Sequence, residues 1–203
     1  MGNNMTKRQM AAMETRRKLI EAAKEIICEK GLVNTSIEEI TNACGVSNGT
    51  FYTYFKRKED IIFELSNEMY AEIYEKASKH KGTFMERLIF FMVNFSGYIE
   101  KSSLKLCQEW VRNNADPDIP DVPEGKNKLE LDTKLVKELI LKGIEKGELK
   151  EDTPVDILAH TLVDILYGEM LCWDMTGGEF SFRERTEEFC NIFLNSVIGP
   201  YLK

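Results

Sequence analysis

The sequence has few of the residues and motifs on which enzyme active sites are built. It contains two histidines, His80 and His160, and neither stands in a nucleophile motif or a metal-binding motif. Neither of the glycine-rich phosphate loops, G-x-x-x-x-G-K-[ST] and G-x-G-x-x-G, occurs. These absences disfavour an enzyme, and we expect neither a cofactor nor a metal ion.

The cysteines do not form the patterns of disulfide-rich or zinc-binding proteins. Their number, five, is odd, they are widely spaced, and no C-x-x-C pair occurs among them. We expect reduced and mostly buried thiols. A redox switch through one of them stays open as an alternative. The five are Cys28, Cys44, Cys107, Cys172 and Cys190.

Long apolar runs are also missing. No stretch approaches 18 uncharged apolar residues, and the first 23 residues hold no apolar run of signal-peptide length. We therefore expect a soluble, cytoplasmic protein without a membrane partner. Hydrophobic residues make up 43% and charged residues 30%, which is typical of a folded globular chain.

The net charge of −7 is unevenly distributed along the chain. Residues 1–58 hold ten Lys and Arg against six Glu, a net +4, which leaves −11 for the remainder. A basic segment on an acidic body can approach phosphates with one end while the other end is repelled. Ordinary charge scatter is the alternative.

Helix signals fill the first 60 residues. Apolar residues recur at spacings of three and four up to Gly31, which suits a position just after a helix. Ser36 and Glu39 form a capping box that begins a second helix, and Gly45 ends it. Ser47 is a fresh N-cap, so the segment SNGTFYTYF is predicted to form a short third helix.

The same periodicity continues to the end of the chain, and no strand signal interrupts it. Three prolines in residues 116–125 predict a surface loop. The pattern predicts an all-α fold of about nine helices. Beyond the first three, we expect helices over residues 58–80, 83–101, 103–113 and about 135–147, one opening at Thr153 and Pro154, and a last one from Ser181 to about Gly199.

Residues 16–65, above all TSIEEITNACGVSNGTFYTYFKRKEDI, resemble the DNA-binding domain of the tetracycline-repressor (TetR) family. The remainder resembles the family in its helix pattern and in the segment GIEKGELKEDTPVD. The resemblance implies a three-helix helix-turn-helix domain over residues 1–57 and a larger helical effector-binding and dimerisation domain over residues 58–203. It further implies a repressor that binds a palindromic DNA operator as a homodimer and releases it when an effector binds.

The start of the third helix carries residue types that suit a major groove. Gly49 permits close backbone approach, Thr50 offers a methyl and a hydroxyl, and Asn48 can pair with adenine. By resemblance, Tyr52 and Tyr54 contact the DNA backbone, and Lys58 meets a phosphate. The predicted DNA-binding residues are Ser36, Ser47, Asn48, Gly49, Thr50, Tyr52, Tyr54, Lys56 and Lys58.

Two positions depart from the family pattern. Arg57 stands where the family usually places an Asn, Asp or Ser helix cap, and Thr41 stands where it usually places Ala. Loss of the cap leaves the start of the fourth helix uncertain by a residue or two. Thr41 is expected to crowd the third helix slightly.

Abundant aromatic residues and little basic charge in the second domain favour a hydrophobic or aromatic effector. Asp164 is unusual within a very apolar segment, and facing solvent is its alternative to lining a pocket. The loop at 116–124 is either a gate or an ordinary acidic surface loop. The predicted effector residues are Phe91, Phe95, Tyr98, Trp110, Asp164, Tyr167 and Met170. Plain core is the alternative for all of them except Asp164, which alternatively faces solvent or pairs across an interface.

The resemblance implies that the last two helices pair with those of a second chain as a four-helix bundle. Gly168 would let two backbones approach there, with an intrachain packing role as its alternative. Phe189 and Phe193 are the other predicted interface residues. A purely structural helical bundle that binds no DNA remains the competing interpretation.

Overall fold

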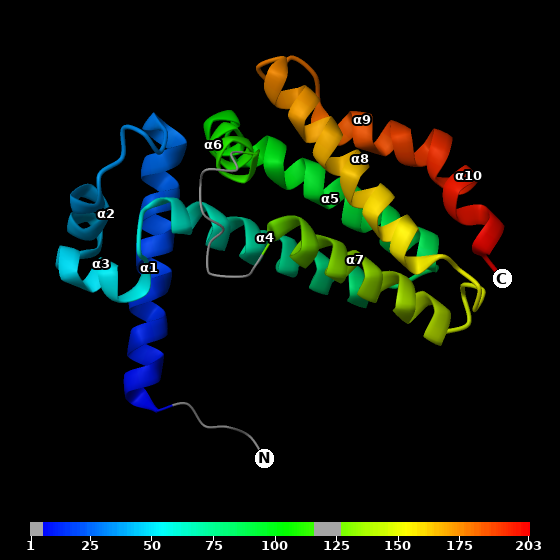
Figure 1. Ribbon diagram of the computed structural model, residues 1–203, viewed down its shortest axis with the longest axis horizontal. Coiled ribbons are helices and arrows are strands. Elements are labelled where there is room, and N and C mark those ends of the chain that lie inside the picture. Colours follow the sequence, from blue (N-terminus) through cyan, green and yellow to red (C-terminus); the bar gives the residue numbers. More distant parts are fainter. Residues whose placement is uncertain (1–5, 116–126) are drawn as a thin grey trace.

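A computed structural model describes residues 6–115 and 127–203, and every long element in these ranges is a helix. Figure 1 shows α1 crossing beside α2 and α3 at one end of the molecule, with the other helices bundled at the other end. The predicted all-α class is confirmed. The helices are α1 (Lys7–Lys30), α2 (Ile37–Cys44), α3 (Asn48–Tyr54), α4 (Glu59–Lys79), α5 (Phe84–Ser102), α6 (Leu104–Ala115), α7 (Lys128–Glu145), α8 (Val155–Met175), α9 (Phe182–Phe189) and α10 (Asn195–Ile198).

Side-chain caps fix most of the helix starts that the sequence predicts. The capping boxes of Ser36 with Glu39 and of Thr83 with Glu86 are both formed. A third box, in which Thr6 pairs with Gln9, begins α1 far earlier than its apolar spacing indicates. The first turns of α1 consequently project beyond α2 and α3 (Figure 1).

Two hydrophobic cores lie on either side of the junction between α1 and α4. The smaller one joins α1, α2 and α3, and it includes Ile61 and Ile62 from the first turn of α4. The larger one fills the space between α4, α5, α7, α8 and α9. Trp110 of α6 packs against both. We call α1, α2 and α3, which carry most of the predicted DNA-binding residues, the DNA-binding module. Its core is completed by the start of α4. The predicted domain boundary after residue 57 stays a prediction.

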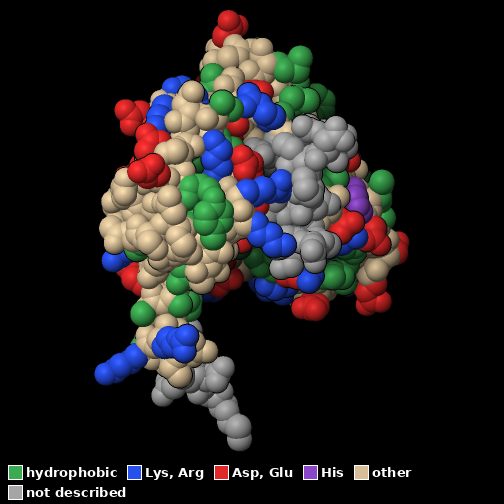
Figure 2. Space-filling model, turned by 60° about the vertical axis from the view of Figure 1, so that its left-hand side comes forward, with side chains coloured by type: hydrophobic (Ala, Val, Ile, Leu, Met, Phe, Trp, Pro, Cys, Tyr) green, Lys and Arg blue, Asp and Glu red, His purple; other side chains and the backbone are tan. Residues whose placement is uncertain are grey.

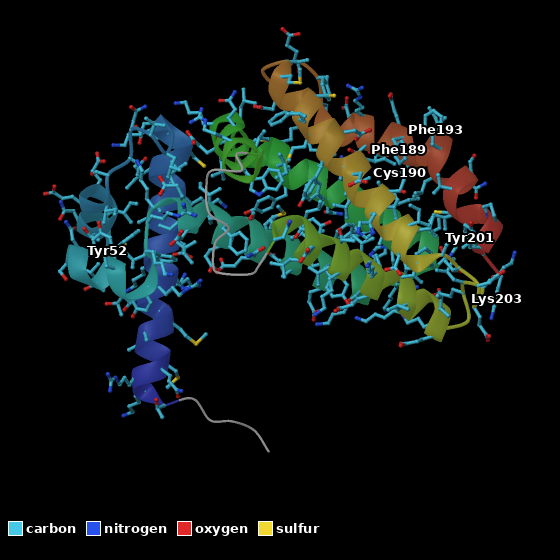
Figure 3. All side chains as sticks on the ribbon, viewed as in Figure 1. Tyr52, Phe189, Cys190, Phe193, Tyr201 and Lys203 are labelled. Carbon is cyan, nitrogen blue, oxygen red and sulfur yellow. The ribbon has the colours of Figure 1, made fainter. Side chains whose placement is uncertain are left out.

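The C-terminal helix is less regular than its sequence pattern predicts. Ser181 caps α9 as expected, but a π-helical turn at Cys190–Leu194 separates α9 from α10. The extra residue in such a turn rotates the side chains that follow it. Phe189 and Phe193 come to lie on one side of it, with their rings stacked at 5.8 Å (Figure 3).

The start of α8 and the end of the chain also differ from the expected pattern. Thr153 does not cap α8, because its hydroxyl donates to the carbonyl of Lys150 at 2.6 Å, and Pro154 takes the N-cap position. The chain end is fixed by backbone hydrogen bonds from Lys150 to Tyr201 at 2.9 Å and from Lys203 to Glu148 at 3.1 Å. The predicted loop at 116–125 lies outside the described residues.

Within residues 6–115 and 127–203, none of the helices has the length and apolar character needed to span a membrane. In the same ranges, no three His, Cys, Asp or Glu side chains are grouped so that they could hold a metal ion.

Gly143 provides a test of the packing between α5 and α7. A Cβ at this buried position would lie 2.7 Å from the ring of Phe84 and 2.9 Å from a methyl of Leu149. We expect Gly143→Ala to lower the free energy of unfolding by about 1–3 kcal/mol, measured by urea denaturation, because the core has no room for the methyl. Glu145→Ala, at an exposed position of the same helix, is the control. An unchanged stability of Gly143→Ala would contradict this packing.

Candidate DNA-binding and effector sites

The turn between α2 and α3 has the geometry of a helix-turn-helix. Gly45 adopts a left-handed conformation with φ 67°, which non-glycine residues rarely adopt, and the amide of Val46 donates to the carbonyl of Thr41 at 3.0 Å. Ser47 then caps α3 by accepting from the amide of Thr50. These local bonds fix the direction in which α3 leaves α2.

The first turn of α3 is exposed at Asn48 and Gly49 and half-exposed at Thr50. The hydroxyl of buried Thr41 lies 2.6 Å from Oδ1 of Asn48, and the hydroxyls of Ser47 and Thr50 are 3.0 Å apart. Thr41 therefore does more than crowd α3, because it holds the Asn48 side chain by its oxygen. The amide group of Asn48 is left to donate toward a base or a phosphate.

The aromatic residues of α3 divide between surface and core. Tyr52 is 58% exposed on α3, at the end of the molecule away from the C-terminal helices (Figure 3), and Tyr54 is half-buried. Phe51 and Phe55 are buried, as expected for the small core of the module. On the face that Figure 2 brings forward, Lys and Arg side chains lie at the projecting tip of α1 and across the middle of the face, among acidic ones.

Two of the predicted DNA-binding side chains are already engaged within the protein. The Lys58 ammonium donates to the carbonyls of Leu32 at 2.6 Å and Thr35 at 2.8 Å, so it closes the loop between α1 and α2. The Ser36 hydroxyl is held in its capping box by Glu39. Lys58 thus has a loop-stabilising role that the sequence does not reveal, while the phosphate contact predicted for it stays a prediction.

Asp60 explains how α4 begins without a conventional cap. Its carboxylate accepts from the amides of Lys56 at 2.8 Å and Arg57 at 3.2 Å, and from the Arg57 guanidinium at 2.9 Å. The cap that Arg57 lacks is thereby supplied from inside the helix, and α4 begins at Glu59.

The structure places the predicted effector residues in four different surroundings. Phe91, Phe95 and Met170 are at most 2% exposed and belong to the larger core. Asp164 is exposed on α8, so the solvent-facing alternative holds for it. Whether such a residue is buried or exposed depends on which face of its helix points to the core, and apolar spacing alone does not determine this.

Tyr98 and Trp110 line an apolar pocket at the junction between the DNA-binding module and the larger bundle. Lys24 of α1 forms one wall, and its ammonium donates to the Tyr98 hydroxyl at 3.0 Å, which raises the pKa of Lys24. Together with the open solvent at its mouth, the space between these residues is about 420 Å³. Its other lining residues come from α4, α5 and α6 and the turn between the last two, and include Ile62, Leu65, Met69, Ile99, Leu106 and Cys107.

Further contacts join α1 to the turn between α5 and α6, next to this pocket. The Cys28 thiol lies 3.7 Å from the carbonyl of Ser102, and the Lys105 ammonium bonds the carbonyl of Glu29. Closer to the start of α1, Arg16 pairs with Glu64 of α4 at 2.6 Å. Movement of α6 relative to α4 would therefore act on α1.

Tyr167 lies apart from this pocket but is linked to it through Trp110. The two rings meet edge to face at 5.0 Å, and the Tyr167 hydroxyl donates to buried Asp132 at 2.5 Å. Tyr167 is thus half-buried between α6, α7 and α8.

A strip of exposed apolar side chains follows α8 and the π-helical turn. A Cβ at Gly168 would meet nothing within 4 Å, so none of the residues described in the structure packs against that point of α8. Phe193 is 54% exposed, whereas Phe189 is half-buried. We call this strip the α8–π face; its exposed members are Ile157, Gly168, Leu171, Met175, Ile192 and Phe193.

The cysteines are poorly suited to sensing oxidants, because burial raises the pKa of most of them. The pKa rises to about 12 for Cys107 and for Cys190, and it rises for Cys28 and Cys44 as well. A reactive sensor thiol needs a lowered pKa, which favours the thiolate. The structure therefore gives the redox alternative no support at these four positions.

Comparisons with known proteins agree with this geometry. The family model described as "Bacterial regulatory proteins, tetR family" matches residues 19–65. The fatty acid metabolism regulator protein of Bacillus subtilis is 25% identical over 88% of this chain and 93% of its own length.

Two solved structures show a similar fold. The TetR-family repressor FadR of Thermus thermophilus, in complex with lauroyl-CoA, superposes with a TM-score of 0.69 at 21% identity, covering 89% of this chain and 93% of its own. A γ-butyrolactone receptor, described as ArpA-like, gives a TM-score of 0.51 at 20% identity, covering 93% and 100%.

Lys58 provides a test that separates a structural role from a phosphate contact. We expect Lys58→Met to lower the free energy of unfolding by about 1–3 kcal/mol, measured by urea denaturation, because buried carbonyls lose a charged donor. Lys146→Met, at an exposed position, is the control. If Lys58 contacts a phosphate, Lys58→Met should instead reduce the magnitude of the slope of log DNA affinity against log salt concentration by about 0.9. That result would support the predicted phosphate contact.

Proposed function

The chain belongs to the TetR family of bacterial transcriptional regulators, and from this premise we propose that it is a cytoplasmic repressor that a small apolar molecule releases from DNA. The observation that carries the release step is the pocket at the junction of α1, α4, α5 and α6. A ligand there touches the DNA-binding module and the larger bundle at once.

The apolar character of the pocket favours an effector with a hydrocarbon or aromatic body. The FadR of Thermus thermophilus was solved with lauroyl-CoA, and another relative in fold is a γ-butyrolactone receptor. Long acyl chains suit a wall built from Ile62, Leu65, Met69 and Leu106. Tyr98 and Trp110 are the two predicted effector residues that we retain for this pocket.

Release follows from differential binding to two arrangements of α1. In the arrangement described here, α1 is held against α5 and α6 by Lys24 on Tyr98 and by Lys105 on the carbonyl of Glu29. An effector that widens the pocket would separate these partners and turn the module away from its DNA-binding arrangement. The ligand shifts the equilibrium only by its preference for the widened state.

DNA contact is assigned to the exposed first turn of α3 and to its aromatic residues. Asn48, Gly49 and Thr50 lie where a recognition helix meets base edges, and Tyr52 and Tyr54 lie one turn along. Ser47 and Lys56 border this surface. Ser36 and Lys58 support it from within the module.

The α8–π face is proposed to pair with its copy in a second chain. Its apolar side chains are exposed, whereas Leu162, Leu166 and Met170 of the same helix are buried. Gly168 leaves room for close approach. Pairing there would form a four-helix bundle from two chains and present two recognition helices to a palindromic operator.

The DNA-binding proposal is tested by fluorescence anisotropy on DNA from upstream of the protein's own gene. We expect Thr50→Ala to weaken binding to the preferred site by about 5–150-fold, the equivalent of 1–3 kcal/mol for a lost base contact. Tyr52→Ala should weaken binding to all sequences alike, because it removes a backbone contact. Ser78→Ala, near the far end of α4, should bind as the unaltered chain does. Failure of the unaltered chain to bind any duplex specifically, in this assay and in a genome-wide selection, would refute the proposal.

The dimer proposal is tested by analytical ultracentrifugation of Phe193→Glu. We expect a monomer that has also lost most of its operator affinity, because a carboxylate buried in an apolar seam lacks a partner. Leu141→Glu, at a position 46% exposed on α7, should leave the assembly unchanged. A dimer that persists in Phe193→Glu would place the interface elsewhere.

A further inference from the structure

A cluster of polar side chains is buried inside the larger bundle, away from the DNA-binding surface. Tyr70 of α4 is 1% exposed, and Lys128 and Asp132 of α7 are 5% and 2% exposed. Tyr167 reaches the cluster from α8. Three helices thus bring ionisable groups together in a region where the surrounding side chains are apolar.

The charges in this cluster cancel one another. The Lys128 ammonium pairs with one carboxylate oxygen of Asp132 and also lies 4.7 Å from the centre of the Tyr70 ring. The second oxygen of Asp132 accepts from the Tyr167 hydroxyl at 2.5 Å. Burial raises the pKa of Asp132 and lowers that of Lys128. Keeping both side chains charged therefore already costs free energy of desolvation. The cluster as a whole has no net charge with which to balance a charged ligand.

Two buried hydroxyl groups on α4 and α7 have no hydrogen-bond partner among the residues that the structure describes. They are the phenol of Tyr70 and the hydroxyl of Thr133, which is 2% exposed. Buried polar groups in folded proteins are normally hydrogen-bonded, and a group without a partner costs stability. Phe and Val would fill the same space without that cost. A hydrogen-bonding group on a bound ligand would supply the partner that these hydroxyls lack.

The cluster lies just behind the wall of the junction pocket. Met69, which lines the pocket, immediately precedes Tyr70 in α4. Trp110 lines the pocket with part of its side chain and meets Tyr167 edge to face at 5.0 Å. A ligand that displaces the Trp110 ring would meet Tyr167, whose hydroxyl is bound to Asp132 of the cluster.

We propose that Tyr70 and Thr133 recognise a neutral hydrogen-bonding group, a hydroxyl or a carbonyl, at one end of an otherwise apolar effector. This inference rests on the proposed function, and it names the chemistry of the effector's polar end. A carboxylate would compete with Asp132 for Lys128, and an amine would compete with Lys128 for Asp132. Either one would leave an unbalanced charge in the core, which the neutral group avoids.

Four probes with the same ten-carbon skeleton test this selectivity: n-butylbenzene, 4-phenylbutan-1-ol, 4-phenylbutanoate and 4-phenylbutylammonium. Binding to the full chain is followed by titration calorimetry and by tryptophan fluorescence, to which Trp110 contributes. We expect the alcohol to bind at least tenfold more tightly than the acid or the amine, and more tightly than the hydrocarbon. A preference for the acid would assign recognition to Lys128, a preference for the amine would assign it to Asp132, and either would overturn the proposal.

Variants identify the groups that carry the preference. Tyr70→Phe and Thr133→Val should each weaken binding of the alcohol about tenfold and leave binding of n-butylbenzene unchanged. Both should also unfold at an equal or higher temperature without ligand, because each removes an unpartnered polar group. Tyr74→Phe, in the same helix, is the control, since the Tyr74 hydroxyl already donates to Glu138 at 3.1 Å.

The outcomes separate this inference from the proposed function. If the alcohol and the hydrocarbon bind alike and both release the operator, the proposed function stands and the inference fails. If the alcohol binds through Tyr70 and Thr133 but the operator stays bound, the recognition holds and the release mechanism fails. If no probe binds the unaltered chain, the inference is overturned.

Discussion

The packing of α1 against the start of α4 is the contact on which the arrangement of this protein depends. The DNA-binding module has ten residues in its buried core, and two of them, Ile61 and Ile62, belong to α4. A core this small is marginal by itself, so the two α4 residues make up a substantial part of it. The module therefore cannot be oriented independently of α4, and any displacement of α4 is felt by the recognition helix.

This shared core is closed by polar contacts rather than by further apolar ones. The Lys58 ammonium bonds the loop carbonyls of Leu32 and Thr35, and the Asp60 carboxylate accepts from two amides of the loop between α3 and α4. Hydrogen bonds of this kind have strict distance requirements, whereas apolar packing tolerates sliding. They fix the register between α4 and the module. They also give a structural role to Lys58, a lysine whose position suggests DNA contact.

The sequence predicts the fold well wherever structure is set by local interactions. Ser36 with Glu39, Gly45 and Ser47 fix helix ends through groups only a few residues apart, and all of these features form as predicted. The functional assignments were harder. Asp164 and Met170 both lie on α8, yet one faces solvent and the other the core, and only the neighbouring helices decide which.

Some features leave no trace in the spacing of apolar residues along the sequence. The π-helical turn at Cys190–Leu194 interrupts a segment whose pattern predicts one continuous helix. The pairing of Lys128 with Asp132 looks in the sequence like an ordinary surface pair four residues apart in a helix. Lys24 and Cys107 at the junction pocket are separated by more than 80 positions in the chain. Their proximity is a property of the bundle, so it appears only once the helices are placed in space.

The position of α6 then decides how ligand binding can reach the DNA. This helix packs against α1, α4, α5 and α8, and its Trp110 contacts both hydrophobic cores. A ligand that fills the junction pocket must either displace α6 or be accommodated by rotation of Trp110.

Displacement acts directly on α1, because Lys105 and Ser103 bond the carbonyls of Glu29 and Cys28. Rotation of Trp110 acts first on Tyr167 and hence on α8, the helix that also carries most of the α8–π face. A small apolar ligand that only displaces α6 therefore affects the module alone, whereas one that reaches the buried polar cluster affects the module and α8 together.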